Sequence, residues 1–498
     1  MLFSSVIFLF YFLPPVLSLY FIPSHKWRNG FFLLASFAFY SASEGASLPA
    51  LVVSIGANYL FGLWLGRQES EPAERLEGQG GLSKIYRFAT SRKCVLISGI
   101  CFNLGFLAVF KYTGFAVANI NALLGMAGLH LPSVALAAPL GISFYTFHAI
   151  SYLVDTYRHK APVQKDPIRL AIYMAAFPKI LAGPITRYAD AAGELVCRTV
   201  SRENFVYGIE RFVAGFAKKV LIANPLSSVA DAAFAIPAGD LDAPGAWAGI
   251  ICYTLQIYFD FSGYSDMAIG LGRMFGFTFP ENFNFPYISQ SVREFWQRWH
   301  ISLSTWFRDY LYIPLGGNRR GTARNYSNLF VVFLLCGLWH GASWNFVVWG
   351  GWYGLFLVLE RTRFGAFMQS AWRPLRHLYL LLVVVIGWVF FRTDSLGMAA
   401  AYLLAMSGFS GGAGSASHLA LAINNEILAL VPIAIAFCLP LSVLVKRRSS
   451  LPAAGASHGC SGSFCQSASY GIFLGLLFLL SCMSLAGGTH KAFIYFQF

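Results

Sequence analysis

Apolar stretches long enough to cross a membrane, separated by short polar segments, run through the whole chain. A helix that crosses a hydrocarbon core of about 30 Å needs about 20 mostly apolar residues. On that scale the pattern predicts an all-α polytopic membrane protein in which about 11 to 13 helices cross or re-enter the membrane. The expected helices lie near residues 2–22, 30–43, 48–66, 94–112, 139–157, 168–185, 204–223, 246–275, 326–342, 344–360, 377–392, 427–445 and 470–487.

The composition favours a membrane protein over a soluble one. Of the 498 residues, 57% are hydrophobic and only 12% are charged, whereas an average soluble domain has about 25% charged residues. The mean hydropathy is +0.58. Apolar surface on this scale needs lipid to cover it, so we expect one membrane domain over residues 1–498, in contact with membrane lipids.

The net charge of +14 has its explanation in topology. The basic residues stand in short runs between apolar stretches. Membrane proteins show this distribution because loops rich in Lys and Arg tend to stay on the cytoplasmic side. The segment 67–93 holds six Lys and Arg residues, so we place it inside, which puts both chain termini outside. Nucleic acid is therefore not expected as a partner. Further basic clusters fit the same topology at residues 158–165, 319–324, 361–363 and 446–448.

Nine cysteines are scattered along the chain, mostly within apolar stretches. Their spacing matches neither a metal site nor a disulfide framework. The sequence also lacks the phosphate-binding and dinucleotide-binding glycine motifs and the H-E-x-x-H zinc motif. We therefore expect no bound metal and no bound cofactor.

The segment from about 252 to 350 differs from the rest because ionisable residues and tryptophans enter it. Asp260 and Asp266 interrupt an apolar helix, and since charge at membrane depth is costly, they should face a protein interior or a wet cavity. A turn at 282–287 then leads to a dense polar stretch, which indicates either a partly solvated groove or an amphipathic helix at the membrane interface. That stretch contains Arg293, Glu294, Trp296, Arg298, Trp299, His300, Trp306, Arg308 and Asp309.

A histidine also stands near the far end of the next apolar stretch. If residue 326 marks the inner edge of the membrane, His340 lies about 21 Å further on, roughly two-thirds of the way across. An intramembrane histidine is by default a candidate for function. The alternative is a structural hydrogen bond between helices, and for His148 we favour that alternative.

Three motifs within residues 252–350 follow one another in a fixed order. They read Arg293-Glu-Phe-Trp-Gln-Arg-Trp-His-Ile-Ser-Leu-Ser304, then Trp306-Phe-Arg-Asp-Tyr-Leu-Tyr-Ile-Pro-Leu-Gly-Gly-Asn318, then Leu338-Trp-His-Gly341. With the opening 1–13, the segment 177–185 and the closing 493–498, the chain resembles the membrane-bound O-acyltransferase family. Within that family it is most similar to the bacterial alginate and exopolysaccharide O-acetylases.

The resemblance implies a ring of helices around a central tunnel, with His340 as the essential residue and His300 as the second signature histidine. It implies an acetyl-CoA or other acyl thioester donor, or an acyl carrier, on the cytoplasmic side. It also implies a polysaccharide acceptor, a separate periplasmic acetyltransferase as partner, and a multi-pass protein of the bacterial inner membrane with both termini periplasmic. Candidate residues for lining the tunnel are Trp296, Trp299, Arg308, Asp309, Asn318, Trp339, Asp260 and Asp266.

Several alternatives stay open. The acceptor can be alginate, cellulose or another surface glycan, and D-alanyl transfer to teichoic acid uses a similar core. His340 can act as a general base or form a transient acyl-histidine. From other classes, a transporter would use Asp260, Asp266 and His148 as an ion path, and a non-catalytic scaffold of an export complex would use them only structurally.

Overall fold

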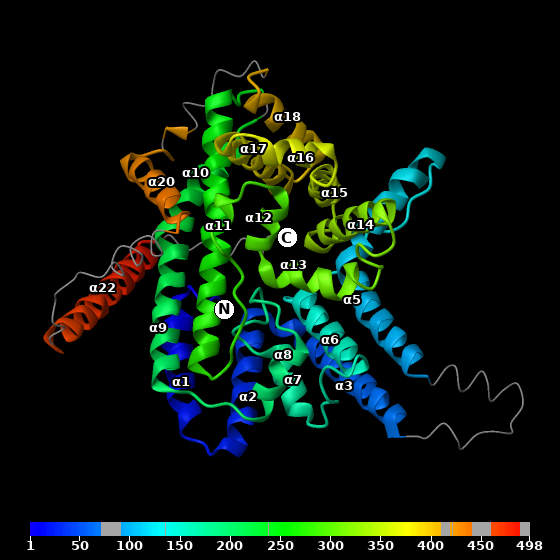
Figure 1. Cartoon of the computed structure of the whole chain (residues 1–498), viewed down its shortest axis with the longest axis vertical. Helices are drawn as coiled ribbons and strands as arrows, with labels where there is room; N and C mark the ends of the chain where they lie inside the picture. The colour runs from blue at the N-terminus through cyan, green and yellow to red at the C-terminus, as the bar shows by residue number, and fades with distance from the viewer. Residues whose placement is uncertain are drawn as a thin grey trace, which may run out of the picture. The chain divides into compact units, whose positions relative to one another are not determined.

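The computed structural model describes residues 1–70, 91–134, 136–237, 239–409, 419–420, 422–440 and 460–488. In that part of the chain every regular element is helical (Figure 1), which confirms the all-α prediction. Several features expected from the sequence lie outside the described residues. They are most of the basic segment 67–93, the basic cluster 446–448 and the tail from residue 489.

The chain divides into two compact units. The first comprises Met1–Gly208 and Leu271–Pro280, and the second comprises Ile209–Gly270 and Glu281–Phe498. Both signature histidines belong to the second unit. The expectation of one membrane domain over residues 1–498 stays a prediction.

In the first unit, the predicted helices near 30–43, 48–66 and 94–112 are present, the last extended by about three turns. The helices of this unit are η1 (Ile7–Phe12), α1 (Leu13–Phe21), α2 (His25–Glu44), η2 (Gly45–Ser47), α3 (Leu48–Ser70), α5 (Arg92–Leu124), η4 (Gly125–Ala127), α6 (Ile142–Tyr157), α7 (Pro167–Ala175) and α8 (Tyr188–Val196). Two helices, α9 (Arg202–Ala217) and α11 (Ala243–Met274), have residues in both units.

The expectation of a continuous helix near 168–185 is wrong. Helix α7 ends at Ala175, and residues 176–187 are buried or nearly so but not helical. The cause is Pro178, whose ring excludes the helical conformation from the residue before it and removes a backbone donor. Gly183 and Pro184 prevent the helix from starting again.

In the second unit the observed helices near 326–342, 344–360 and 377–392 agree with the sequence, whereas α10, α16 and α18 were not expected. The elements of this unit are η5 (Lys218–Ala223), α10 (Asn224–Ala235), η6 (Pro286–Ile288), α12 (Val292–Arg298), α13 (Ile301–Phe307), η7 (Arg308–Tyr312), α14 (Thr322–His340), α15 (Trp344–Leu359), α16 (Arg363–Ser370), α17 (Arg373–Arg392), α18 (Leu396–Met406), α20 (Asn425–Phe437) and α22 (Cys460–Ala486).

Among the described residues, four helical segments are long and apolar enough to cross a membrane. They are Trp27–Arg67, Arg92–Ala127, Arg373–Arg392 and Ser469–Ala486, and four shorter apolar helices accompany them. The protein is therefore a multi-pass membrane protein. The number of crossings, the ring of helices and the central tunnel stay predictions.

Helices α14 and α15 form a tightly packed hairpin in the second unit (Figure 1). Gly337 faces the backbone of Phe346 so closely that a Cβ atom would overlap its carbonyl oxygen, and Gly350 faces the carbonyl of Phe333 in the same way. Glycine at these contacts lets the two backbones approach, as in other membrane helix pairs. The hairpin fixes the end of α14, where His340 lies.

Candidate active site

His340 is the last residue of α14 and is buried, with 7% of its surface exposed. Three aromatic rings meet its imidazole at steep angles. The ring centroids of Trp339, Trp349 and Phe391 lie 4.6, 4.9 and 5.3 Å from that of His340. Such edge-to-face contacts prefer defined geometries, so the aromatic rings fix the orientation of this imidazole.

His300 lies at the N-terminal boundary of the short helix α13 and is completely buried. Its backbone is left-handed, with φ 44° and ψ 53°, a conformation that costs a non-glycine residue about 1–2 kcal/mol. The ring of Phe261 packs edge-on against its imidazole at a centroid distance of 4.7 Å. Backbone strain of this kind persists where the surrounding structure over-determines it, often at functional sites.

The side chain of Asn282 orients His300. Its Oδ1 atom lies 3.0 Å from Nδ1 of His300 and also accepts a 2.9 Å hydrogen bond from the Ser302 hydroxyl. Its Nδ2 atom donates to the hydroxyl of Ser265 at 3.0 Å. Because an amide oxygen only accepts, Nδ1 of His300 must carry the hydrogen. The neutral ring therefore presents Nε2 as its basic nitrogen.

Trp339 joins the two histidines into one site. Its ring centroid lies 6.5 Å from that of His300 and 4.6 Å from that of His340, and its side chain is buried. The structure thus brings two histidines that are 40 positions apart in the sequence against one indole. Buried imidazoles positioned in this way can accept and donate protons during catalysis.

The tryptophans of the first motif pack beside this site. Trp296 contacts the rings of Trp349 and Tyr353 at centroid distances of 5.8 and 5.0 Å, and Trp349 in turn contacts His340. Trp299 lies 5.0 Å from Trp388 and is 2% exposed. Both tryptophans therefore support the histidines through an aromatic core, while their role in lining a substrate tunnel stays a prediction.

The two carboxylates of α11 are ion-paired. The buried Asp260 lies 2.8 Å from the ammonium of the equally buried Lys219. Asp266 accepts from Lys218 at 2.6 Å and from Arg211 at 2.7 Å. Pairing with cations offsets part of the cost of burying these charges, and the ion pairs connect α11 to α9 and η5. Their expected role in lining the tunnel stays a prediction.

The remaining candidates are Arg308, Asp309 and Asn318. Arg308 and Asp309 pair with each other at 2.7 Å on η7, with 57% of the Arg308 side chain exposed. Asn318 is exposed and lines a polar pocket near the start of α14. Their expected role in lining the tunnel stays a prediction.

His148, in the first unit, has the environment of a structural residue. It is fully buried, and its Nε2 accepts a long hydrogen bond of 3.4 Å from the Thr186 backbone, while Tyr173 packs edge-on at 5.3 Å. Within the described residues, no three His, Cys, Asp or Glu side chains are close enough together to hold a metal ion.

Asn282, which orients His300, and its hydrogen-bond partner Ser302 were missed by the sequence analysis. Asn282 was noted only as part of a turn, and Ser302 only as part of a motif. The available signal was a turn with two amides among aromatic residues, the first of which is followed 18 residues later by a histidine. That spacing alone does not predict a hydrogen bond between the two side chains. The direction of the His300 side chain also depends on the left-handed backbone at His300.

This chain belongs to the membrane-bound O-acyltransferase family. The family model matches residues 165–400, a range that includes both histidines, and the finding confirms the resemblance and the enzyme class, an acyltransferase. Among individual relatives, the chain is 40% identical to a probable alginate O-acetylase of Azotobacter vinelandii and 40% identical to that of Pseudomonas putida. Each alignment covers 100% of both chains. A peptidoglycan O-acetyltransferase of Helicobacter pylori is 34% identical over 82% of this chain and 80% of that protein.

Proposed function

We propose that this protein is an O-acetyltransferase that supplies acetyl groups for an exopolysaccharide such as alginate, with His340 at the reacting centre. The observation that carries the proposal is the pair of buried histidines on the Trp339 indole. Full-length similarity to probable alginate O-acetylases supports the acetyl group and the polysaccharide.

The reaction follows from the chemistry of an alcohol and a thioester. The acceptor hydroxyl oxygen attacks the thioester carbonyl carbon while the imidazole of His340 takes the hydroxyl proton. The C–S bond then breaks, and the departing thiolate takes up that proton to leave as a thiol. A positioned base contributes about 10²- to 10⁴-fold to such a step, and burial protects the thioester from water. A transient acyl-histidine is the alternative order of the same bond changes.

Orientation in the membrane forms a second part of the proposal. The basic residues Arg319, Arg320 and Arg324 support a cytoplasmic position for the start of α14. In this topology the protein lies in the inner membrane of a bacterium, and both chain termini are periplasmic. A cytoplasmic acetyl-CoA, another acyl thioester or an acyl carrier would then deliver the acetyl group.

Cysteine labelling tests this orientation in intact cells. Arg320→Cys should be protected from a membrane-impermeant reagent added outside, whereas Gly412→Cys should react, since residue 412 belongs to the predicted outer segment 393–426. Part of that segment, including residue 412, lies outside the described residues. The reverse labelling pattern would invert the topology.

The third part of the proposal is a relay. A polymer with many equivalent hydroxyls requires an extended binding surface for selective modification, and the outer segments predicted from the sequence are short. In the longest of them, 393–426, the described part forms the 11-residue helix α18 (Leu396–Met406). We therefore expect a separate periplasmic acetyltransferase to receive the acetyl group and place it on the polysaccharide.

Reconstitution separates the relay from direct transfer. The purified protein in lipid vesicles would be given acetyl thioester inside and free polysaccharide outside, with and without a periplasmic acetyltransferase. We expect little site-selective acetylation of the polymer without the second protein. Efficient, selective acetylation by this chain alone would make it the terminal transferase.

Chemical analysis of the cell surface identifies the acceptor. Cells with and without the protein should differ in O-acetyl content of one glycan, and alginate, cellulose and peptidoglycan are analysed separately. A change in D-alanyl esters of teichoic acid instead would identify the alternative acyl group. Unchanged surface acylation together with failed polysaccharide export would favour the scaffold.

A further inference from the structure

A basic and aromatic segment connects α15 to α17 in the second unit. It covers residues 361–376, which include α16 and the first turn of α17, and we call it the arginine segment. It contains no aspartate and no glutamate. Its four cations are Arg361, Arg363, Arg373 and Arg376.

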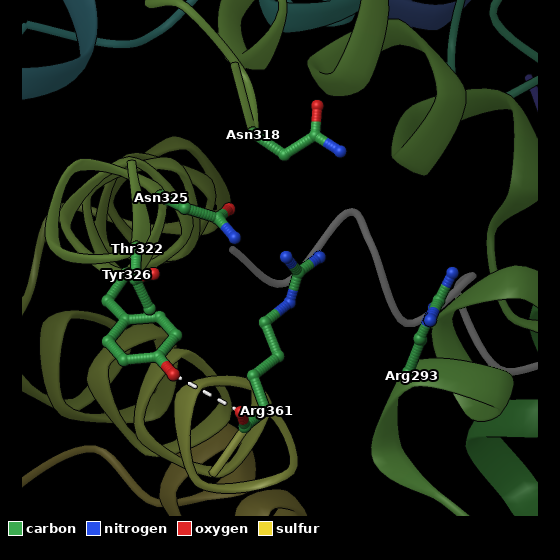
Figure 2. Close-up of a pocket in the computed structure, with 6 residues that line it drawn as sticks. All are labelled: Arg293, Asn318, Thr322, Asn325, Tyr326 and Arg361. Atoms are coloured by element: carbon green, nitrogen blue, oxygen red, sulfur yellow. Dashed lines mark hydrogen bonds between the residues drawn. The ribbon is translucent and has the colours of Figure 1, made fainter. Parts of the chain in front are cut away.

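Two contacts hold the arginine segment on neighbouring helices. The hydroxyl of Tyr326, on α14, donates a 3.2 Å hydrogen bond to the backbone carbonyl of Arg361, and Figure 2 shows this bond as a dashed line. The ring of Phe364, on α16, meets that of Tyr379, on α17, edge-on at a centroid distance of 5.6 Å. The segment is therefore a packed part of the fold, and its arginines have defined positions on it.

The charges of the arginine segment are not neutralised by the protein. Within the part of the chain that the structure describes, none of its four guanidiniums takes part in an ion pair. Arg373 and Arg376 are three residues apart on α17, a spacing that places them on the same side of the helix. Glu360, the carboxylate that directly precedes the segment, instead accepts hydrogen bonds from the backbone N–H groups of α12 at Val292 and Arg293.

Large apolar side chains of the same segment are exposed. Phe367, Trp372 and Leu375 are 62%, 76% and 47% exposed. Trp372 directly precedes α17, which is one of the four helices long and apolar enough to cross a membrane. Tryptophans at the ends of membrane helices mark the level of the lipid headgroups. Basic residues beside exposed aromatic ones are typical of a helix that lies in this interface.

We propose that the arginine segment binds anionic phospholipids, with its guanidiniums on the headgroup phosphate and Phe367 and Trp372 at the start of the acyl chains. The planar donors of arginine match phosphate oxygens, and basic residues next to a membrane helix attract anionic lipids. A lipid covers both the charges and the exposed rings, whereas a free anion covers only the charges. Lipid binding here does not depend on the acetyl transfer proposed for His340.

Native mass spectrometry of the purified full-length protein tests the site, because it counts the lipids that stay bound when detergent is removed. The probes are phosphatidylglycerol, which is anionic, and phosphatidylcholine, which is zwitterionic, with the same acyl chains. We expect the intact protein to retain phosphatidylglycerol in preference. Arg373→Gln combined with Arg376→Gln should weaken phosphatidylglycerol binding by about 25-fold, since each basic residue contributes about fivefold. Phosphatidylcholine binding should not change.

Three further variants separate the effect of charge from that of folding. Arg363→Gln, on α16, should weaken phosphatidylglycerol binding by about fivefold and serves as the test where the double variant does not fold. Arg373→Lys combined with Arg376→Lys keeps both charges and should retain most of the binding. The matched control is Arg169→Gln, which removes one charge from the first turn of α7, where Asp166 pairs with it at 3.2 Å. This control should bind phosphatidylglycerol as the intact protein does.

The same measurement contains the results that would overturn the site. Equal retention of the two lipids by the intact protein would do so, as would an equal loss of phosphatidylglycerol in Arg169→Gln and in Arg363→Gln. Displacement of phosphatidylglycerol by inorganic phosphate at the same concentration would show that the arginines bind phosphate without a lipid. If an acidic carrier protein binds the segment and phosphatidylglycerol does not, the segment is a docking surface for protein and the lipid site falls.

Discussion

The two histidines of the site are held by different kinds of interaction. His300 is fixed by directional hydrogen bonding, through Asn282, on a strained left-handed backbone. His340 lies at the end of a regular helix and contacts the rings of Trp349 and Phe391 edge-on. A hydrogen bond selects one tautomer of the imidazole, whereas edge-to-face ring packing restrains the plane of the imidazole.

The difference indicates a division of labour between the two residues. A group that exchanges a proton in each catalytic cycle must keep its ring plane, and the edge-on aromatic rings around His340 provide this. A group that keeps one tautomer and one direction suits positioning or a single hydrogen bond to substrate, which describes His300. Substitutions at the two sites should therefore differ in size and in character.

The largest effect is expected for His340→Ala. Removal of the central base should lower acetyl transfer by about 10²- to 10⁴-fold, while the protein still inserts, because its fold rests on many helices. O-acetyl content of the surface polysaccharide, normalised to the amount of protein in the membrane, measures this. Near-normal acetylation in this variant would refute the assignment of His340.

A smaller loss is expected for His300→Ala. Its ring centroid lies 6.5 Å from that of Trp339, further than the 4.6 Å of His340, so its loss should reduce transfer by about 10²-fold, at the lower end of acid–base effects. Relief of the left-handed backbone by His300→Asn, which tolerates that conformation, should restore stability without restoring activity. Full activity in His300→Asn would reduce this histidine to a structural element.

The next effect concerns Asn282. Asn282→Ala leaves His300 and Ser302 without their buried acceptor, a loss of about 1–3 kcal/mol per unsatisfied group. We expect roughly a tenfold decrease in kcat with KM little changed. Asn282→Asp keeps an acceptor oxygen and should recover part of kcat, which a merely structural role would not require. Equal kcat values for the two variants would contradict the positioning role.

The smallest effect is expected for Phe391→Leu, which removes one of the rings against His340. An aromatic pair contributes about 0.5–1.5 kcal/mol beyond burial, so kcat should fall severalfold. The control is Phe390→Leu, because the Phe390 ring contacts Trp352 at a centroid distance of 6.3 Å rather than His340. If both variants have the same kcat, the aromatic rings do not orient the imidazole.

The sequence predicted much of the helical framework. Residues 246–275 and 344–360 were expected as helices and are close to α11 and α15, because long apolar runs are the strongest signal in a membrane protein. The failure at 168–185 has a local cause in Pro178 and Pro184. The short helix α10 escaped notice because it lies between two predicted spans and is shorter than either.

The sequence identified both histidines of the site but not what holds them. The partners of Asp260 and Asp266 are Lys219 and Lys218, which precede them by more than 40 residues, and no local pattern links such positions. Asn282 reaches His300 because the chain between them turns back, with left-handed backbone at Phe285 and at His300 itself. Long-range pairings of this kind depend on tertiary packing, which periodicity and composition do not encode.

The glycine contacts between α14 and α15 have a mechanical consequence. Gly337 and Gly350 bring the two backbones into direct contact, and close-packed protein interiors have low compressibility. Sliding α14 along α15 would drive its neighbouring side chains into that seam. Because His340 ends α14, substrates must come to a stationary imidazole, and any gate for donor or acceptor belongs to elements outside this hairpin.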